Sequence, residues 1–172
     1  METGNNNREQ MMGVLLYSAI SPDYILRTII FTDRRVLEIP LSKISEFVGR
    51  ISQLPSVAAW LVEAANPSMF GGLGSMVGLK MWKNLRKNTE GKQVVFEGNG
   101  PLPDQTTSLA TSELFYDKIK SAEIKKVPLS SDYYLKLDAG FWHSKNIVFD
   151  GRAADDVTKL VNKTALSQKL KV

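Results

Sequence analysis

The chain has 172 residues, of which 43% are hydrophobic and 23% are charged, so it can bury one sizeable core and is not a disordered protein. The absence of cysteine excludes disulfides, cysteine–zinc sites and thiol catalysis. The net charge of +4 is mildly basic, and nucleic-acid binding would require that charge to be clustered on one surface.

The first ten residues are polar and hold no apolar anchor, so we expect residues 1–10 to form a disordered tail. They lack the basic start and apolar core of a secretory signal, and we therefore expect a cytoplasmic protein. Strand-forming residues then fill Met11–Ile20, and Pro22 ends that strand because proline cannot donate to a central ladder. We expect residues 11–172 to form a single domain.

A β-hairpin is predicted at Ile29–Ile39, where two β-branched runs flank the polar corner Thr32-Asp33-Arg34-Arg35. The first arm extends from Tyr24 to Thr32, and its apolar and polar residues are not cleanly separated between the two faces. We therefore expect this strand to be half covered on both sides. The second arm covers Arg35–Pro40.

After Leu41 the apolar period changes to that of an amphipathic helix. The residues that carry this period are Ile44, Phe47, Val48, Ile51 and Leu54. A second helical stretch follows at Ser56–Ala65, and a glycine-rich apolar run at Met69–Leu79 leads into a basic amphipathic helix. We expect residues 41–90 to form a helical insertion in the domain.

Short strands return after the insertion, at Gln93–Glu97, Ile119–Val127, Tyr133–Asp138 and Lys145–Asp150, with a loop predicted at Gly98–Thr107. A final amphipathic helix is predicted from Arg152 to about Leu166. Its expected inward residues are Ala153, Val157, Leu160, Val161 and Thr164. Asp155 and Asp156 lie near its start, where the helix dipole favours acidic residues. The last residues, Gln168–Val172, are expected to form a basic tail.

The order of these elements resembles the pleckstrin-homology-like (PH-like) superfamily, and most closely its prokaryotic PH-like and GRAM-like members. The resemblance rests on the corner Thr32-Asp33-Arg34-Arg35, on the later segment with Tyr116, Asp117 and Ile119, and on the terminal helix. It covers roughly residues 11–40 and 93–166. It implies an α+β protein with a split antiparallel β-barrel and a C-terminal capping helix, and it leaves the function open because this fold carries many.

No cluster of residues in the sequence predicts catalysis. His143 is the only histidine, and the adjacent Ser144 would point to the opposite face of a strand, so the two would not form a nucleophile–base pair. The start of a helix explains Asp155 and Asp156 without a metal ion. The glycine run follows helical sequence and lacks the lysine of a phosphate-binding loop. We therefore expect no catalytic, metal or cofactor site.

Two functions remain open, and both use the insertion. The first is a non-enzymatic PH-like interaction module that docks a protein partner or a second copy. The alternative is a peripheral membrane protein that lays the insertion on anionic lipid, because the uncharged run at residues 64–79 is shorter than the roughly 20 residues of a spanning helix. The contact residues predicted for either function are Trp60, Phe70, Met76, Lys80, Trp82, Lys83, Arg86 and Lys87.

Overall fold

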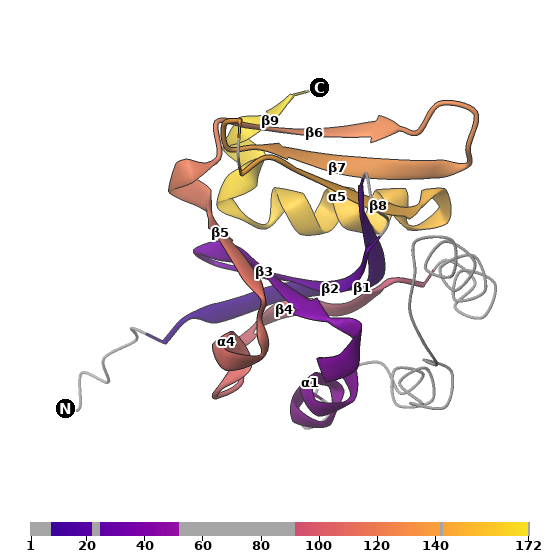
Figure 1. Ribbon diagram of the computed structural model, residues 1–172. Coiled ribbons are helices and arrows are strands. Elements are labelled where there is room, and N and C mark those ends of the chain that lie inside the picture. Colours follow the sequence, from indigo (N-terminus) through magenta and orange to yellow (C-terminus); the bar gives the residue numbers. More distant parts are fainter. Residues whose placement is uncertain (1–7, 22–24, 52–91, 142, 172) are drawn as a thin grey trace.

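The computed structural model describes residues 8–21, 25–51, 92–141 and 143–171 (Figure 1). The second helical stretch, the glycine-rich run and the basic helix predicted within residues 52–91 lie outside the described part of the chain. The domain boundaries predicted from the sequence stay predictions, because residues 1–7 lie outside that part as well.

The described strands form one sheet. They are β1 (Gln10–Ser21), β2 (Ile25–Thr32), β3 (Arg35–Pro40), β4 (Val94–Pro101), β5 (Ser112–Phe115), β6 (Ser121–Lys126), β7 (Asp132–Asp138), β8 (Lys145–Asp150) and β9 (Leu170–Lys171). The α-helices are α1 (Ile44–Ile51), α4 (Thr106–Leu109) and α5 (Ala154–Asn162). Short 3₁₀ helices are η1 (Leu41–Lys43), η3 (Tyr116–Lys118), η4 (Gly151–Ala153) and η5 (Ala165–Lys169).

The strands follow the order β5-β3-β2-β1-β8-β7-β6-β9, and β4 pairs with β1 away from that path. All of these pairs are antiparallel except β6 with β9, so the sheet is mixed. The β2–β3 hairpin predicted at the corner Thr32-Asp33-Arg34-Arg35 is confirmed. The α+β class is confirmed, while the path of paired strands runs from β5 to β9 without closing.

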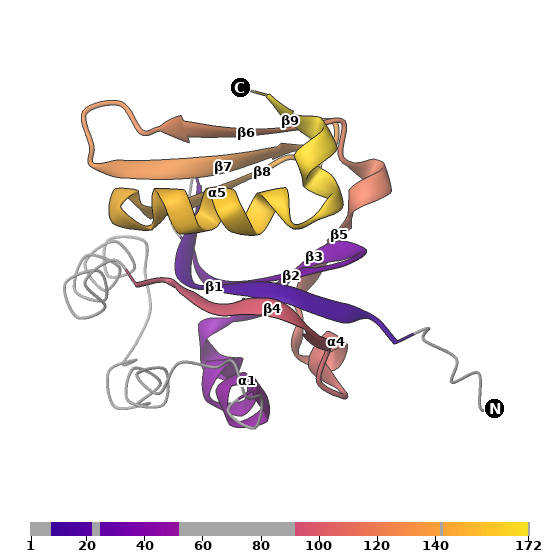
Figure 2. The ribbon, with the colours of Figure 1, turned by 180° about the vertical axis from the view of Figure 1, so that it is seen from behind.

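Strand β2 is buried on both faces, which is more coverage than its sequence predicted. Ile29 and Phe31 face an inner core that α5 covers, whereas Leu26 and Ile30 face an outer core that α1 covers. All four side chains are 6% exposed or less. Figure 2 shows α5 lying along one side of the molecule, between the layer of β6, β7 and β8 and the strands below it. A strand covered on both faces has no reason to alternate, which explains its mixed pattern.

The terminal helix buries the predicted face. All five expected inward residues are 5% exposed or less, and Asp155 and Asp156 lie in the first turn of α5. The helix is shorter than predicted, because the hydroxyl of Thr164 donates to the carbonyl of Val161 at 2.7 Å and then accepts from the amide of Leu166 at 3.2 Å. These bonds end α5 and start η5.

Two segments predicted as irregular are ordered elements. The predicted loop Gly98–Thr107 contributes its first residues to β4 and its last to α4, because Leu102 and Leu109 are buried in the outer core and hold the segment against the sheet. The predicted tail Gln168–Val172 was also wrong in part, since Leu170 and Lys171 form β9 beside β6. In both cases tertiary contacts decide the conformation of a segment whose own pattern is weak.

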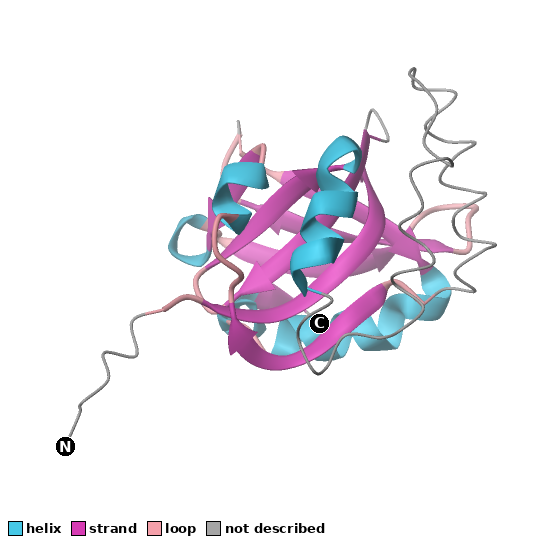
Figure 3. Ribbon diagram, turned by 90° about the horizontal axis from the view of Figure 1, so that it is seen from below, coloured by secondary structure: helices cyan, strands magenta, loops and turns pink. Residues whose placement is uncertain are grey.

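One edge of β1 pairs with two different strands in succession. The first half of β1 pairs with β4 along this edge, and residues Ala19–Ser21 pair with β8. Between them the β1–β2 register shifts, and Tyr17 adopts a left-handed conformation with φ of 51°. This bulge bends β1 sharply, so that its two halves serve two different layers (Figure 2). Figure 3 shows the strands and helices from below.

The side chain of Gln93 lies at the point where the pairing of β1 changes from β4 to β8. Its side-chain amide donates to the carbonyls of Leu16 at 2.9 Å and Tyr17 at 3.3 Å, and its side-chain oxygen accepts from the amide of Asp150 at 2.7 Å. Its backbone carbonyl also accepts from the amide of Leu16 at 2.8 Å. The side chain is buried and replaces the hydrogen bonds that the branching ladder leaves open.

Two glycines give a matched test of the packing. A Cβ atom at Gly151 would lie 2.1 Å from the carbonyl oxygen of Ser131, whereas a Cβ atom at Gly49, within α1, meets nothing within 4 Å. Gly151→Ala should destabilise the protein by about 3 kcal/mol through overpacking. Gly49→Ala should stabilise it by about 1 kcal/mol through helix propensity. Urea denaturation of both variants checks this, and a loss of stability in both would contradict the packing described here.

Candidate functional site

All eight contact residues predicted from the sequence lie outside the described part of the chain. They are Trp60, Phe70, Met76, Lys80, Trp82, Lys83, Arg86 and Lys87. The structure does describe the two places where the insertion leaves and rejoins the sheet. It also describes a group of polar clusters and a surface cavity that could serve a partner.

The first described helix of the predicted insertion is α1, whose apolar face is buried. Phe47 and Ile51 of α1 are fully buried in the outer core, so the predicted amphipathic period is confirmed over α1, while Leu54 lies outside the described residues. The chain rejoins the sheet at Gln93, whose hydrogen bonds to β1 and β8 are given above. The described residues that flank residues 52–91 are therefore both buried, Ile51 in α1 and Gln93 beside β1.

The polar corner between β2 and β3 is a hydrogen-bonded turn. The hydroxyl of Thr32 accepts from the amides of Arg34 at 3.1 Å and Arg35 at 2.9 Å. The carboxylate of Asp33 accepts from the amide of Gln10 at 3.0 Å, which ties the turn to the start of β1. The hydroxyl of Tyr116 donates to the carbonyl of Thr32 at 2.9 Å. The short polar side chains of Thr32 and Asp33 therefore close the β2–β3 turn and hold it against the start of β1.

Arg35 is engaged inside this region. Its guanidinium donates to both carboxylate oxygens of Glu9, at 3.0 and 2.7 Å, and it also pairs with Glu113. It lies 5.2 Å from the ring centroid of Phe115, which adds a cation–π contact. Since its side chain is 14% exposed, Arg35 is a structural group. Arg34 lies at the surface, 3.9 Å from Asp33.

Pairing of Glu9 with Arg35 lowers the pKa of Glu9 and raises the pKa of Arg35. Burial acts to raise the pKa of Glu9, but the hydrogen bonds from Arg35 and Thr32 and the charges of Arg35 and Arg34 outweigh it and hold that pKa below its usual value. The hydrogen bonds that Arg35 donates to Glu9 raise the pKa of the Arg35 guanidinium, against the effect of burial. The pair therefore stays ionised at neutral pH and holds the N-terminal segment to β3.

A second polar cluster links strand β8 with strands β3 and β5. The ammonium group of Lys145 on β8 pairs with the carboxylate of Glu38 on β3 and donates to the hydroxyl of Ser112 on β5 at 2.8 Å. The side chains of Lys145 and Glu38 are 18% and 8% exposed. Sequence reasoning missed this cluster, although a single acidic residue inside the apolar run Val36–Ile39 is the signal that could have indicated it.

The Lys145 cluster has the residue types of a serine–lysine dyad but a different arrangement. A lysine that activates a serine must accept a proton, and this needs a free amine. Here the Lys145 nitrogen donates to Ser112 and is bound to the buried carboxylate of Glu38 at the same time. The arrangement links β8 with β3 and β5.

The remaining sequence candidates are separated in the structure. His143 is exposed in the turn between β7 and β8, and the hydroxyl of its neighbour Ser144 donates to Asp138 at 3.1 Å. Asp155 and Asp156 lie at the start of α5, where Asp156 pairs with Lys159 at 3.2 Å. Within the described ranges no group of three or more His, Cys, Asp or Glu residues could hold a metal ion.

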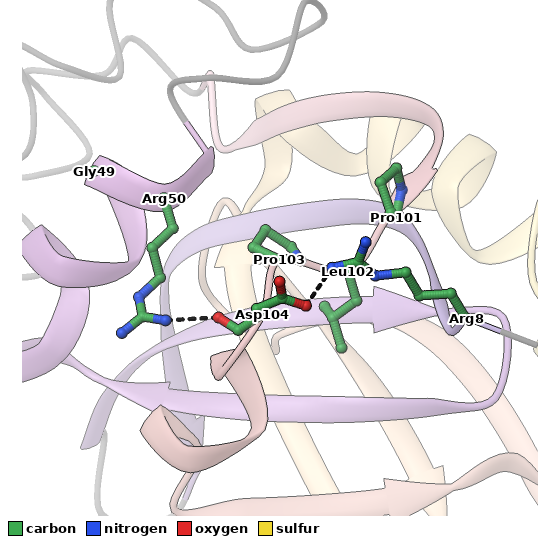
Figure 4. A pocket seen from close by; sticks show the side chains of 7 residues that line it. All are labelled: Arg8, Gly49, Arg50, Pro101, Leu102, Pro103 and Asp104. Atoms are coloured by element: carbon green, nitrogen blue, oxygen red, sulfur yellow. Dashed lines mark hydrogen bonds and ion pairs between the residues drawn. The ribbon is translucent and has the colours of Figure 1, made fainter.

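A cavity of about 450 Å³ lies between α1 and the segment that follows β4 (Figure 4). Its lining residues are Arg8, Gly49, Arg50, Pro101, Leu102, Pro103 and Asp104. Arg50 donates to the carbonyl of Asp104 at 2.6 Å and to the carboxylate of Glu46 at 2.7 Å, and Arg8 pairs with the carboxylate of Asp104. Both arginines that line this cavity therefore already pair with a carboxylate of the chain. The cavity is a surface recess whose positive charges are compensated within the protein.

Several large apolar side chains are exposed at the edges of the described structure. Leu129 in the β6–β7 turn and Phe141 in the β7–β8 turn are the most exposed, followed by Ile25 and Phe115. They lie on separate loops and strand ends. Single exposed apolar residues are common on protein surfaces, so these four by themselves do not indicate a binding surface. No described helix is long and apolar enough to cross a membrane.

Comparisons with known proteins give no match for this chain: no protein-family description fits it, and no curated protein or solved structure is significantly similar to it.

The low pKa of Glu9 gives a test of the Arg35 cluster. A folded-state pKa below the ordinary 4.5 means that the pair stabilises the fold above that pH and that this stability is lost as the pH falls through the folded-state pKa. Glu9→Gln should therefore cost about 2 kcal/mol at pH 7, and its difference from the wild type should shrink on acidification.

Urea denaturation from pH 7 down to pH 3 measures this difference. Glu123→Gln removes an exposed pair with Lys125 and serves as the control, which should leave the pH dependence unchanged. A wild-type pH dependence that survives in Glu9→Gln would show that the Glu9–Arg35 pair does not stabilise the fold.

Proposed function

We propose that this chain is a non-enzymatic PH-like interaction module that docks a protein partner, or a second copy of itself, through the helical insertion at residues 41–90. The single observation that carries the proposal is that the described residues on either side of residues 52–91 are buried, Ile51 of α1 in the outer core and Gln93 at the branch of β1. A rigid scaffold that presents one long segment is a common design of binding proteins.

The PH-like part of the proposal is supported by the layout of the sheet. The strands form two antiparallel groups, β5-β3-β2-β1 and β8-β7-β6, which join through β1 and β8 and share one inner core with α5. The Lys145–Glu38 pair also connects β8 of one group with β3 of the other. A split, strongly bent sheet with a terminal capping helix is what the resemblance implies.

The non-enzymatic part is supported by the state of the polar clusters. Arg35 and Lys145, which have the residue types of ligand-binding or catalytic groups, are each bound to carboxylates of this chain. Their pairing stabilises the fold and leaves the insertion as the segment with surplus apolar and basic residues. Aromatic residues such as Trp60 and Trp82 are the side chains that most often anchor protein interfaces.

A triple variant tests docking by the insertion. We expect Trp60→Ser, Phe70→Ser and Trp82→Ser together to abolish self-association or partner binding, because hot-spot aromatics carry most of the energy of an interface. Light scattering over a range of concentrations measures self-association, and co-purification from the source cells followed by reconstitution measures a partner. Phe141→Ser removes an exposed aromatic on the β7–β8 turn and is the matched control. Association that is unchanged in the triple variant would contradict docking by these residues.

The alternative, a peripheral membrane protein, draws on the basic residues of the insertion, Lys80, Lys83, Arg86 and Lys87. Each contributes about 1 kcal/mol near an anionic surface, so the four together are enough for measurable binding. Co-sedimentation with vesicles of anionic and of neutral lipid separates the two functions. Binding to anionic vesicles alone that is lost on reversal of the four charges would favour the membrane and count against protein docking.

A further inference from the structure

The step from Asn99 to Gly100 is the only Asn-Gly sequence among the 172 residues. It lies near the end of β4, and glycine also precedes it at Gly98. The side chain of Asn99 is exposed to solvent. The local sequence therefore places an asparagine between two residues without side chains, where water and neighbouring backbone atoms can reach its amide.

The backbone at this step is irregular. Glu97 of β4 pairs with Gly13 of β1, and Gly100 pairs with Met11, so Gly98 and Asn99 both lie opposite Met12. Such an extra residue is a β-bulge, which leaves the bulged residue outside the regular ladder. Gly98 has φ of 155°, at the edge of the range that side chains disfavour. The bulge gives Asn99 more conformational freedom than a residue inside a paired strand.

We propose that Asn99 is a site of spontaneous deamidation. The backbone nitrogen of Gly100 attacks the side-chain carbonyl carbon of Asn99 and loses its proton, and ammonia leaves as the five-membered succinimide ring closes. Water then opens the ring at either carbonyl carbon. Opening at one carbonyl gives aspartate at position 99, and opening at the other gives isoaspartate. The reaction consumes one water, releases one ammonia and needs no oxidant or cofactor.

The other described asparagines lack these conditions. Asn162, at the end of α5, is exposed but precedes Lys163, and Asn146 lies in β8 before Ile147. A side chain on the following residue hinders the approach of its backbone nitrogen, and glycine has none. Asp150 precedes Gly151 and could close the same ring, but Asp150 is 1% exposed and its carboxylate accepts from Arg152 at 2.9 Å.

The change has a defined effect on the fold. Isoaspartate adds one methylene to the main chain, which displaces Gly100 and Pro101 from their partners Met11 and Gln10 on β1. Aspartate at the same position adds a negative charge to β4 without lengthening it.

Peptide mapping by mass spectrometry tests the proposal. The purified full-length chain is held in mildly alkaline buffer, and conversion of Asn99 is compared with that of Asn162 and Asn146 in the same sample. We expect Asn99 to convert several-fold faster than either, with isoaspartate and aspartate both present, and we expect Asn99→Ser to remove the acidic charge variant that accumulates. Conversion of Asn99 in the folded protein at the rate of Asn162, even if it is fast after unfolding in urea, would overturn the proposal.

Discussion

The buried side chain of Gln93 is the interaction on which the arrangement of the sheet depends. β1 must change partners along one edge, from β4 to β8, and the bulge at Tyr17 leaves backbone groups there without a ladder. A glutamine has two donors and an acceptor on one amide, which is what two carbonyls of β1 and one amide of Asp150 require. The carboxylate of Asp150 then accepts from the amide of Arg152 and fixes the start of the segment that leads into α5.

Two charged pairs of low exposure serve this same framework. Arg35 holds the N-terminal segment through Glu9, and Lys145 ties β8 to Glu38 and Ser112 on the facing strands. Burial of one partner without the other would leave an unpaired charge, so each pair also restricts which strands can face each other. Because these charged groups are engaged within the fold, we propose the insertion as the binding site.

Elements with a strong local pattern could be predicted from the sequence. The hairpin at Thr32–Arg35, the inward face of α5 and the amphipathic period of α1 all follow from spacing alone. Strand β9 and helix α4 could not, because they form through contacts with β6 and with the outer core. Among the candidate functional residues, the Lys145–Glu38–Ser112 cluster joins positions that only the folded chain brings together. The acidic residue inside the apolar run Val36–Ile39 hints at a buried partner, but the sequence does not say which residue that partner is.

The free energy of unfolding of Gln93→Leu tests the central role of this residue most directly. Leucine has a similar volume but leaves two buried carbonyls and one buried amide without partners, and we predict a loss of about 3 kcal/mol. Gln168→Leu, at an exposed position in η5, should change stability by less than about 0.5 kcal/mol. If Gln93→Leu unfolded in urea with the same free energy as Gln168→Leu, the branch of β1 would not depend on Gln93, and this account of the fold would be wrong.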